Sequence, residues 1–410
     1  MKSKAAFNWI VALIIFSTPL LTLTVSHGGT GNYLLLMLLG MVTGWKQIRR
    51  FNRLETFFFT GLLLLFLVNV MSFSQTQNIS GGYTWLGKYL YLFLGLFAYA
   101  VIKERFDFLV KHLDFFLIIN SIAIGSIALY QYYYLNIPRV YGGTHIILFG
   151  NVAVVMLGLT LCRLFFAKPH WLMYLSAVFC LTGAILSQTR GAMIAIPVIL
   201  LFLVIWSKGY QNKKLVIISL VSVTIIISSL FISDSPVRQR FVSMAKDFQG
   251  LMSDQEKIIK PFWRVEFWKN SLILFKENPV LGIGPGDYNV EMKALVESGQ
   301  AINKSDMNYS WTPHSNFVNA LVTSGSIGLF TFIFALFILP LFLIRLFRST
   351  VNQPAYFMVI LTSYFIFGIT TTWIATNSAF SIFMVLLLFS LAYMNKKIEV
   401  PDESLKLDGR

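Results

Sequence analysis

The stretch from Glu55 to Phe73 reads ETFFFTGLLLLFLVNVMSF, and its single charged residue stands at its start. About 20 consecutive apolar residues form an α-helix long enough to cross the hydrocarbon core of a bilayer. No water is available there to satisfy backbone amides, so a crossing segment of this kind must be helical. This stretch therefore predicts a transmembrane helix, and similar stretches recur along the 410 residues.

The composition of the whole chain is that of a membrane protein. Hydrophobic residues make up 56% of the positions and charged residues 12%, whereas a soluble domain is roughly 25% charged. The mean hydropathy is +0.69. The bilayer must therefore solvate most of the surface. Cys162 and Cys180 lie inside apolar stretches, and we interpret them as small hydrophobes rather than as a disulfide or metal ligands.

The apolar stretches predict an all-α integral membrane protein with about 12 transmembrane helices. The first stretch could instead be a cleavable signal peptide. We interpret it as a retained helix, because it is long enough to span and no clear cleavage site follows it. The predicted spans are residues 7–26, 30–45, 55–73, 83–102, 113–135, 146–166, 171–188, 191–207, 214–232, 315–345, 354–375 and 377–394.

The distribution of Lys and Arg predicts the orientation. With the N-terminus in the cytoplasm, the inner connections hold 18 basic residues, whereas the short outer ones hold three, Lys88, Arg139 and Arg190. Both termini are therefore expected in the cytoplasm. The net charge of +15 follows mostly from this topology and from attraction to anionic membrane lipids. The basic residues are dispersed among short loops, so no nucleic-acid partner is expected.

We predict four regions along the chain: helices one to nine in residues 1–232, an outer loop in 233–313, helices ten to twelve in 314–395, and a cytoplasmic tail in 396–410. The outer loop is large and mostly helical, with ten basic and ten acidic residues. An amphipathic helix is expected from Val237 to Leu251 and another from about Phe262 to Lys276. The GIGPG sequence at 282–286 favours a tight turn over a phosphate loop, since Pro285 interrupts it and no strand precedes it.

Two arginines point to an anionic ligand. Arg190 lies in the SQTRG sequence at 187–191, between apolar stretches joined by almost no loop. A guanidinium at the membrane boundary is costly unless it snorkels, pairs or binds a ligand, and the adjoining stretches hold no carboxylate. Arg264 is flanked by aromatic residues, and an ion pair with Glu266 or Asp254 is its alternative role. The planar fork of arginine suits phosphate oxygens, so the two arginines together could hold a pyrophosphate.

His314 lies in the TPHSN sequence at 312–316, where the outer loop re-enters the membrane. A histidine with a pKa near neutrality can take a proton from an acceptor hydroxyl; a helix-capping or other structural role is the alternative. Arg139 is a fourth candidate on the same side, with loop anchoring as its alternative role. His145 and Lys88 receive less weight.

Several other chemistries are not supported by the sequence. It contains no nucleotide-binding P-loop, no His/Cys metal constellation, no paired intramembrane carboxylates for proton relay and no Asp-x-Asp motif. We therefore expect neither a cofactor nor a bound metal.

Taken together, these motifs resemble the O-antigen ligase/polymerase family. The resemblance rests on SQTRG at 187–191, on Arg-x-x-x-Trp from Arg264 to Trp268, and on PHSN at 313–316 followed by TSGSIGL at 323–329. The Arg-x-x-Gly-Gly sequence that begins at Arg139 is similar to the ligase branch. Through its twelve-span layout the resemblance covers nearly the whole chain.

The resemblance implies glycan transfer from an undecaprenyl-pyrophosphate donor to a sugar hydroxyl of lipid A-core, at the periplasmic face of a Gram-negative inner membrane. It implies that Arg190 and Arg264 bind the donor pyrophosphate and that Arg139 supports its charge. His314 would orient or deprotonate the acceptor hydroxyl. An inverting, metal-independent reaction is expected. The alternatives are an O-antigen polymerase, a protein O-oligosaccharyltransferase and, with less support, a flippase or transporter for the same lipid carrier.

Overall fold

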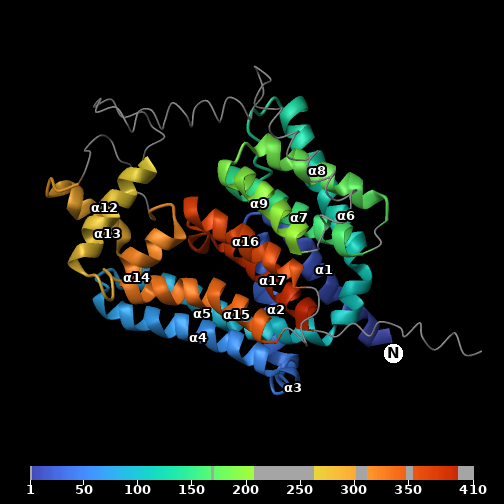
Figure 1. Ribbon diagram of the computed structural model, residues 1–410, viewed down its shortest axis with the longest axis horizontal. Coiled ribbons are helices and arrows are strands. Elements are labelled where there is room, and N and C mark those ends of the chain that lie inside the picture. The colour runs from blue at the N-terminus through green and yellow to red at the C-terminus, as the bar shows by residue number, and fades with distance from the viewer. Residues whose placement is uncertain (1, 168–169, 207–262, 302–311, 348–353, 396–410) are drawn as a thin grey trace, which may run out of the picture.

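The computed structural model describes residues 2–167, 170–206, 263–301, 312–347 and 354–395, and the regular secondary structure in these ranges is helical (Figure 1). The helices that coincide with predicted apolar stretches are α1 (Lys2–Thr24), α2 (Gly28–Thr43), α4 (Arg53–Ser72), α5 (Ile79–Glu104), α6 (Phe106–Leu129), α7 (Ile146–Phe166), α8 (Leu172–Ser187), α9 (Arg190–Trp206), α14 (Asn316–Ile333), α15 (Leu339–Leu346), α16 (Ala355–Thr370) and α17 (Asn377–Asn395). The remaining elements are α3 (Trp45–Ile48), α12 (Trp263–Glu277), α13 (Tyr288–Glu297), the 3-10 turns η1 (Phe73–Gln75) and η6 (Trp373–Ala375), and the π-helical turns η2 (Tyr130–Tyr134) and η5 (Phe334–Ile338).

The described part of the chain is that of a multi-pass membrane protein. Seven of its helices are long and apolar enough to cross a membrane, and α2, α8, α9 and α16 are shorter apolar helices. Of the twelve predicted stretches, only 214–232 lies outside the described residues, as does the predicted amphipathic helix at 237–251; each of the others coincides with a helical segment.

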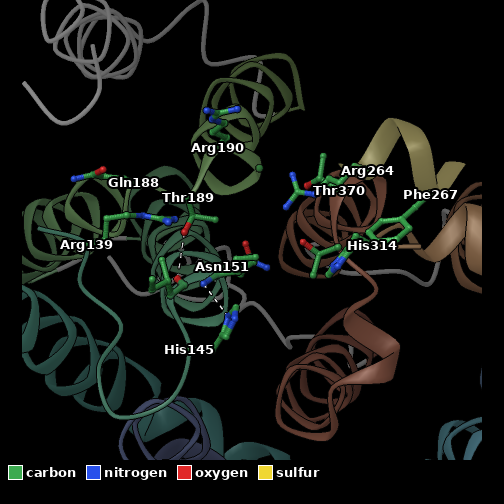
Figure 2. A pocket seen from close by; sticks show the side chains of 14 residues that line it. Arg139, His145, Asn151, Gln188, Thr189, Arg190, Arg264, Phe267, His314 and Thr370 are labelled. Atoms are coloured by element: carbon green, nitrogen blue, oxygen red, sulfur yellow. Dashed lines mark hydrogen bonds between the residues drawn. The ribbon is translucent and has the colours of Figure 1, made fainter. Parts of the chain in front are cut away.

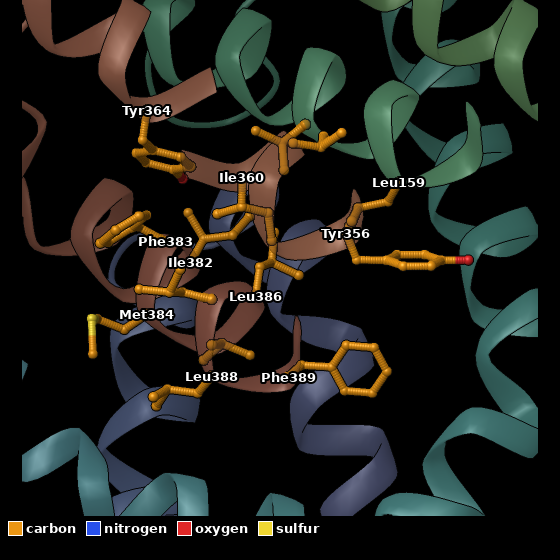
Figure 3. Packing of buried hydrophobic residues seen from close by; sticks show 14 of the residues in the cluster. Leu159, Tyr356, Ile360, Tyr364, Ile382, Phe383, Met384, Leu386, Leu388 and Phe389 are labelled. Carbon is orange, nitrogen blue, oxygen red and sulfur yellow. The ribbon is translucent and has the colours of Figure 1, made fainter. Parts of the chain in front are cut away.

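Helices α7 and α17 form the centre of the bundle. Both are apolar around their whole circumference, as expected of helices surrounded by other helices, and nearly all of their residues are buried. Helix α17 packs against α1, α2, α5 and α16. Figure 3 shows its Phe383 and Leu386 side chains among those of α16, including Ile360 and Tyr364. The ends of α7 and α16 at the predicted outer face extend from this buried core.

Connections predicted to share one face of the membrane meet in the structure. This agreement supports the alternating topology, because the contacts join residues that are far apart in the sequence. At the predicted outer face, hydrogen bonds join Gly143 to Leu23, Val140 to Leu186 and Thr76 to Pro285. At the predicted inner face, side chains join Lys103 to Glu55, Arg163 to Asp114 and Asn52 to Asn395.

The described part of the predicted outer loop forms a small unit docked on the bundle. Helix α12 begins and ends within one residue of the helix predicted at 262–276. The predicted turn at 282–286 is also confirmed, with positive φ at Gly282, Gly284 and Gly286. After this turn the Asp287 carboxylate, which is fully buried, accepts hydrogen bonds from the backbone N–H groups of Gln77 and Asn78, at 2.6 and 2.9 Å.

Helix α14 is broken at Gly325, whose φ is 69° and ψ is −167°. A break leaves helical carbonyls without their usual partners, and buried carbonyls must find others. Here the glycine-rich turn supplies them. The N–H groups of Ile283 and Gly284 donate to the carbonyls of Val322 and Thr323, at 3.0 and 3.1 Å, and Ser326 N–H donates to Pro279. The turn that follows α12 is thereby joined to the first half of α14.

The prediction of a helix through residue 375 was wrong by five residues. Helix α16 ends at Thr370, Thr371 is extended, and η6 follows. Thr370 begins a run of three threonines, and such β-branched residues lose side-chain freedom in a helix. The indole of Trp373 is buried and donates to the Tyr364 carbonyl at 3.0 Å, which holds the chain back against the bundle. This early end leaves Thr370 and Thr371 beside a cavity.

Candidate functional site

A cavity of about 430 Å³ lies where four segments of the predicted outer face converge (Figure 2). Its walls are the η2–α7 connection with the start of α7, the α8–α9 connection, the first turns of α12 with the residues before α14, and the end of α16. All four predicted site residues line it, namely Arg139, Arg190, Arg264 and His314. No Asp or Glu is among the described residues of its lining. The structure thus brings together four cationic or titratable side chains from positions up to 175 residues apart in the sequence.

Arg190 is positioned by the tight connection between α8 and α9. Helix α8 ends at Ser187, the C-cap residue Gln188 has a φ of 51° that reverses the chain, and α9 begins at Arg190. The Thr189 hydroxyl donates to the Ile146 carbonyl at 3.2 Å, and Ser187 Oγ accepts from Thr189 N–H at 3.3 Å. The connection is therefore fastened to the start of α7, and Arg190 faces the cavity from a fixed turn.

Glycine is required on the facing turn of α7. A Cβ at Gly150 would lie 2.5 Å from Ser187 Oγ and 2.7 Å from Thr189 Cβ. Any side chain there would push the α8–α9 connection, and with it Arg190, away from α7.

Arg139 lies in a loop that is clamped from two sides. The Gln188 side chain donates to the Pro138 carbonyl, and Val140 N–H donates to the Leu186 carbonyl at 3.2 Å. From the other side Gln131, buried in η2, accepts from the backbone N–H groups of Tyr141 and Gly142 at 3.0 Å each. Because Gln188 precedes Arg190 by two residues, the same connection orients both arginines.

Arg264 and His314 are linked through the aromatic residues that follow Arg264 in α12. The Trp268 indole donates to the Pro313 carbonyl at 3.0 Å, and the Phe267 ring lies 5.9 Å from the His314 ring between centroids. These aromatic residues are visible in the sequence, but their contact with His314 depends on the docking of the loop unit.

His314 has a left-handed backbone, with φ of 54°. The next residue, Ser315, caps α14: its hydroxyl accepts from Val318 N–H and donates to the Gly368 carbonyl at 3.1 Å. The predicted alternative of a capping role for His314 is therefore not observed, because the adjacent serine performs it. The histidine side chain is left to line the cavity.

The electrostatics of the cavity favour an anion. The pKa of Arg264 is lowered by burial and, second, by the positive charge of Arg190. Two guanidinium groups close enough to repel each other are stabilised by a ligand that carries negative charge to both. The N-termini of α7, α9 and α14 also end at the lining, and helix N-termini add to a positive potential.

The surroundings of His314 favour its neutral form. Burial lowers its pKa, and the charge of Arg264 and the nearby His145 lower it further. A neutral imidazole has a lone pair available, which is the state that a proton acceptor needs at neutral pH.

Two polar residues of the lining, His145 and Asn151, were not among the predicted site residues. His145 caps α7 directly after the Arg139 loop, and Asn151 is a buried polar residue within the otherwise apolar stretch from Ile146 to Leu159. A polar residue inside a predicted span is a recognised signal of function, and it was available in the sequence. Lys88 does not line the cavity; its ammonium donates to the Ala375 carbonyl and lies over the Trp85 ring.

Two comparisons with known proteins gave matches. A Haemophilus influenzae protein described as "Uncharacterized protein" is 23% identical over 293 residues, which is 70% of each chain. The second match carries a description of function and covers the α8–α9 connection, α12 and the whole of α14. Residues 175–333, which include Arg190, Arg264 and His314, match the model of the O-antigen ligase family.

Proposed function

We propose that this protein is a glycosyltransferase that moves an O-antigen polysaccharide from undecaprenyl pyrophosphate to a sugar hydroxyl of lipid A-core at the periplasmic face of the membrane. The observation that carries the proposal is the convergence of Arg139, Arg190, Arg264 and His314 on one cavity. The O-antigen ligase match over residues 175–333 supports the same class of substrate.

The reaction needs a stabilised leaving group and an activated acceptor. The bond between the anomeric carbon of the donor sugar and the phosphate oxygen breaks, and its electron pair leaves with the lipid pyrophosphate. The acceptor oxygen forms the new bond to the same carbon. Its proton passes to a ring nitrogen of His314. In-line attack from the opposite side inverts the anomeric centre.

The arginines would stabilise the charge that develops on the pyrophosphate. Arg190 and Arg264 are close enough to lower the pKa of Arg264, so a pyrophosphate that contacts both relieves their repulsion. Fixed cations aimed at developing charge are an effective form of catalysis, because they need no reorganisation during the reaction. A pyrophosphate held by cations is also a good leaving group without a general acid. Arg139, fixed by its clamped loop, would add a third positive charge.

His314 would accept the proton of the acceptor hydroxyl. The lowered pKa keeps the imidazole neutral, and the Trp268–Pro313 hydrogen bond ties its backbone to the helix that carries Arg264. Arg264, which would stabilise the donor, and His314, which would activate the acceptor, are thereby held in a fixed relation to each other. In this proposal residues 233–313 are the periplasmic loop, and both termini are cytoplasmic.

An O-antigen polymerase is the second candidate, because it would use the same donor and the same cations. The two functions differ in the acceptor: a ligase glycosylates lipid A-core, whereas a polymerase extends a second lipid-linked glycan. We favour the ligase because of the Arg-x-x-Gly-Gly sequence at Arg139 and the Thr-Arg-Gly sequence at 189–191.

Deleting the gene tests the choice between these candidates. Without a ligase, cells should make lipid A-core that carries no polysaccharide, while the lipid-linked polymer accumulates. Electrophoresis of lipopolysaccharide, together with analysis of extracted lipid-linked glycan, measures both. Absence of the polymer itself would contradict the ligase assignment and support the polymerase.

A further inference from the structure

We propose that the start of α7 forms a subsite for a sugar hydroxyl, made by the His145 imidazole and the Asn151 amide. The subsite lies on the cavity wall formed by α7, whereas Arg264 and His314 approach from the loop unit (Figure 2). This inference rests on the proposed glycosyl transfer and adds a recognition element to it.

Asn151 is the first observation. Its side chain is 5% exposed, yet it lines the cavity, and Figure 2 shows its amide directed into the space between α7 and His314. The buried Oδ1 accepts no hydrogen bond from the described residues. A buried acceptor that lacks a donor is unfavourable, so the site is completed by a ligand that donates a hydrogen bond.

The requirement for a donor excludes the pyrophosphate as the partner of Asn151 Oδ1. An ionised phosphate oxygen only accepts hydrogen bonds, and next to a carbonyl oxygen it would be repelled. A sugar hydroxyl can donate to Oδ1. It also has lone pairs left over for a second protein group.

His145 provides that second group. Its Nδ1 accepts a hydrogen bond from Ile147 N–H at 3.2 Å, as the cap of α7. In the neutral ring the proton must then be on Nε2, so the imidazole presents a donor and not a lone pair. Burial and the charge of Arg139 lower the His145 pKa, which favours this neutral form.

The two side chains line the same cavity and have the two capacities that a hydroxyl needs: His145 Nε2–H can donate to it and Asn151 Oδ1 can accept from it. The same pairing assigns different tasks to the two histidines of the cavity. His145 binds, because its acceptor nitrogen is occupied by the helix cap. His314 is the histidine proposed to take a proton.

The hydroxyl could belong to the first sugar of the donor or to the acceptor sugar, and one set of variants distinguishes them. His145→Asn retains a side-chain oxygen that caps α7, because Asn is a favoured N-cap residue, but it lacks the reach of Nε2. His145→Gln keeps an amide N–H near the position of Nε2. Asn151→Ala removes the acceptor. Asn120→Ala is the matched control, since Asn120 is buried in α6 and donates to the Phe16 carbonyl, away from the cavity.

The measurement is binding by the purified full-length protein in detergent. The donor probes are undecaprenyl pyrophosphate without sugar and the same lipid with its glycan; the acceptor probe is lipid A-core. We expect His145→Asn and Asn151→Ala to lower the affinity for one of the two sugar-bearing probes about tenfold or more. The affinity for undecaprenyl pyrophosphate without sugar should be unchanged. His145→Gln and Asn120→Ala should remain close to wild type.

The possible outcomes distinguish failure of the proposed subsite from failure of the proposed glycosyl transfer. Weakened binding of the glycan-bearing donor assigns the hydroxyl to the donor, and weakened binding of lipid A-core assigns it to the acceptor. Unchanged binding of both by His145→Asn and Asn151→Ala overturns the subsite. Equal weakening of sugar-free undecaprenyl pyrophosphate also overturns it, since His145 and Asn151 would then act on the diphosphate. Failure of wild type to transfer any glycan would instead count against the proposed function.

Discussion

At the scale of single residues, the cavity depends on backbone conformations that place side chains at the points where helices begin or end. His314 and Gln188 both have positive φ, at 54° and 51°, a conformation that costs L-residues roughly 1–2 kcal/mol. In both cases neighbouring hydrogen bonds hold the strained residue. Functional residues in sparsely populated conformations persist only where the surrounding structure determines them.

Substitution of His314 tests its proposed role without disturbing this backbone. We choose His314→Asn, because Asn tolerates the left-handed conformation better than Ala. Transfer should fall by about 10²–10⁴, the usual contribution of a general base. Thermal unfolding of the purified variant should match wild type. Wild-type transfer by His314→Asn would remove the general base from the mechanism.

The pH dependence of wild-type transfer provides a second test at this scale. The base acts only when neutral, so the rate falls as pH decreases through the pKa of His314. Since burial, Arg264 and His145 lower that pKa, the acidic limb of kcat/KM should have its midpoint below 6.5, the ordinary value for histidine. A midpoint above 6.5 would contradict this prediction, because it would mean that a nearby negative charge raises the pKa of His314 more than burial and Arg264 lower it.

At the scale of elements, the site is assembled by the junction of the glycine-rich turn with the break in α14. Periodicity predicted α12 to within one residue, and the turn at 282–286 followed from its glycines and proline. The break at Gly325 could not be predicted in the same way, because its backbone partners come from Pro279–Gly284, some 40 residues earlier. For the same reason the contacts of Trp268 and Phe267 with the His314 region were not foreseen.

A glycine substitution at this junction tests its importance. In Gly325→Ala the new Cβ would lie 2.1 Å from the Val280 carbonyl oxygen, at a φ of 69°. We expect the loop unit to separate from α14, with loss of transfer and a lower unfolding temperature. Gly87→Ala in α5 is the control, since its Cβ meets nothing within 4 Å and helix propensity favours Ala by about 1 kcal/mol. Equal transfer by the two variants would contradict the proposed role of the junction.

At the scale of the whole molecule, hydropathy and the Lys/Arg distribution were sufficient to predict a helical bundle whose connections segregate onto two faces. They could not predict which helices lie at the centre, because α7 and α17 are no more apolar than several lipid-exposed helices. They also could not show that Arg139 and Arg190 line the same cavity, since the Gln188–Pro138 hydrogen bond between their loops has no sequence signature. Which face is cytoplasmic remains a prediction.

Cysteine labelling tests that orientation. Cys162 and Cys180 are buried, so single introduced cysteines can report on each face. Ser80→Cys lies in the first turn of α5, at the predicted outer face, and Gln47→Cys lies in α3, at the predicted inner face. A membrane-impermeant maleimide should label Ser80→Cys in intact spheroplasts and Gln47→Cys only after permeabilisation. The opposite pattern would place the cavity in the cytoplasm and exclude the proposed periplasmic reaction.

The most direct test of the central claim is transfer by the purified protein, supplied with undecaprenyl-pyrophosphate-linked glycan and lipid A-core in the presence of a metal chelator. Wild type should produce glycosylated lipid A-core with inverted anomeric configuration and should release undecaprenyl pyrophosphate, whereas His314→Asn should not. Growth of the glycan on its lipid carrier, with lipid A-core unmodified, would contradict the ligase assignment.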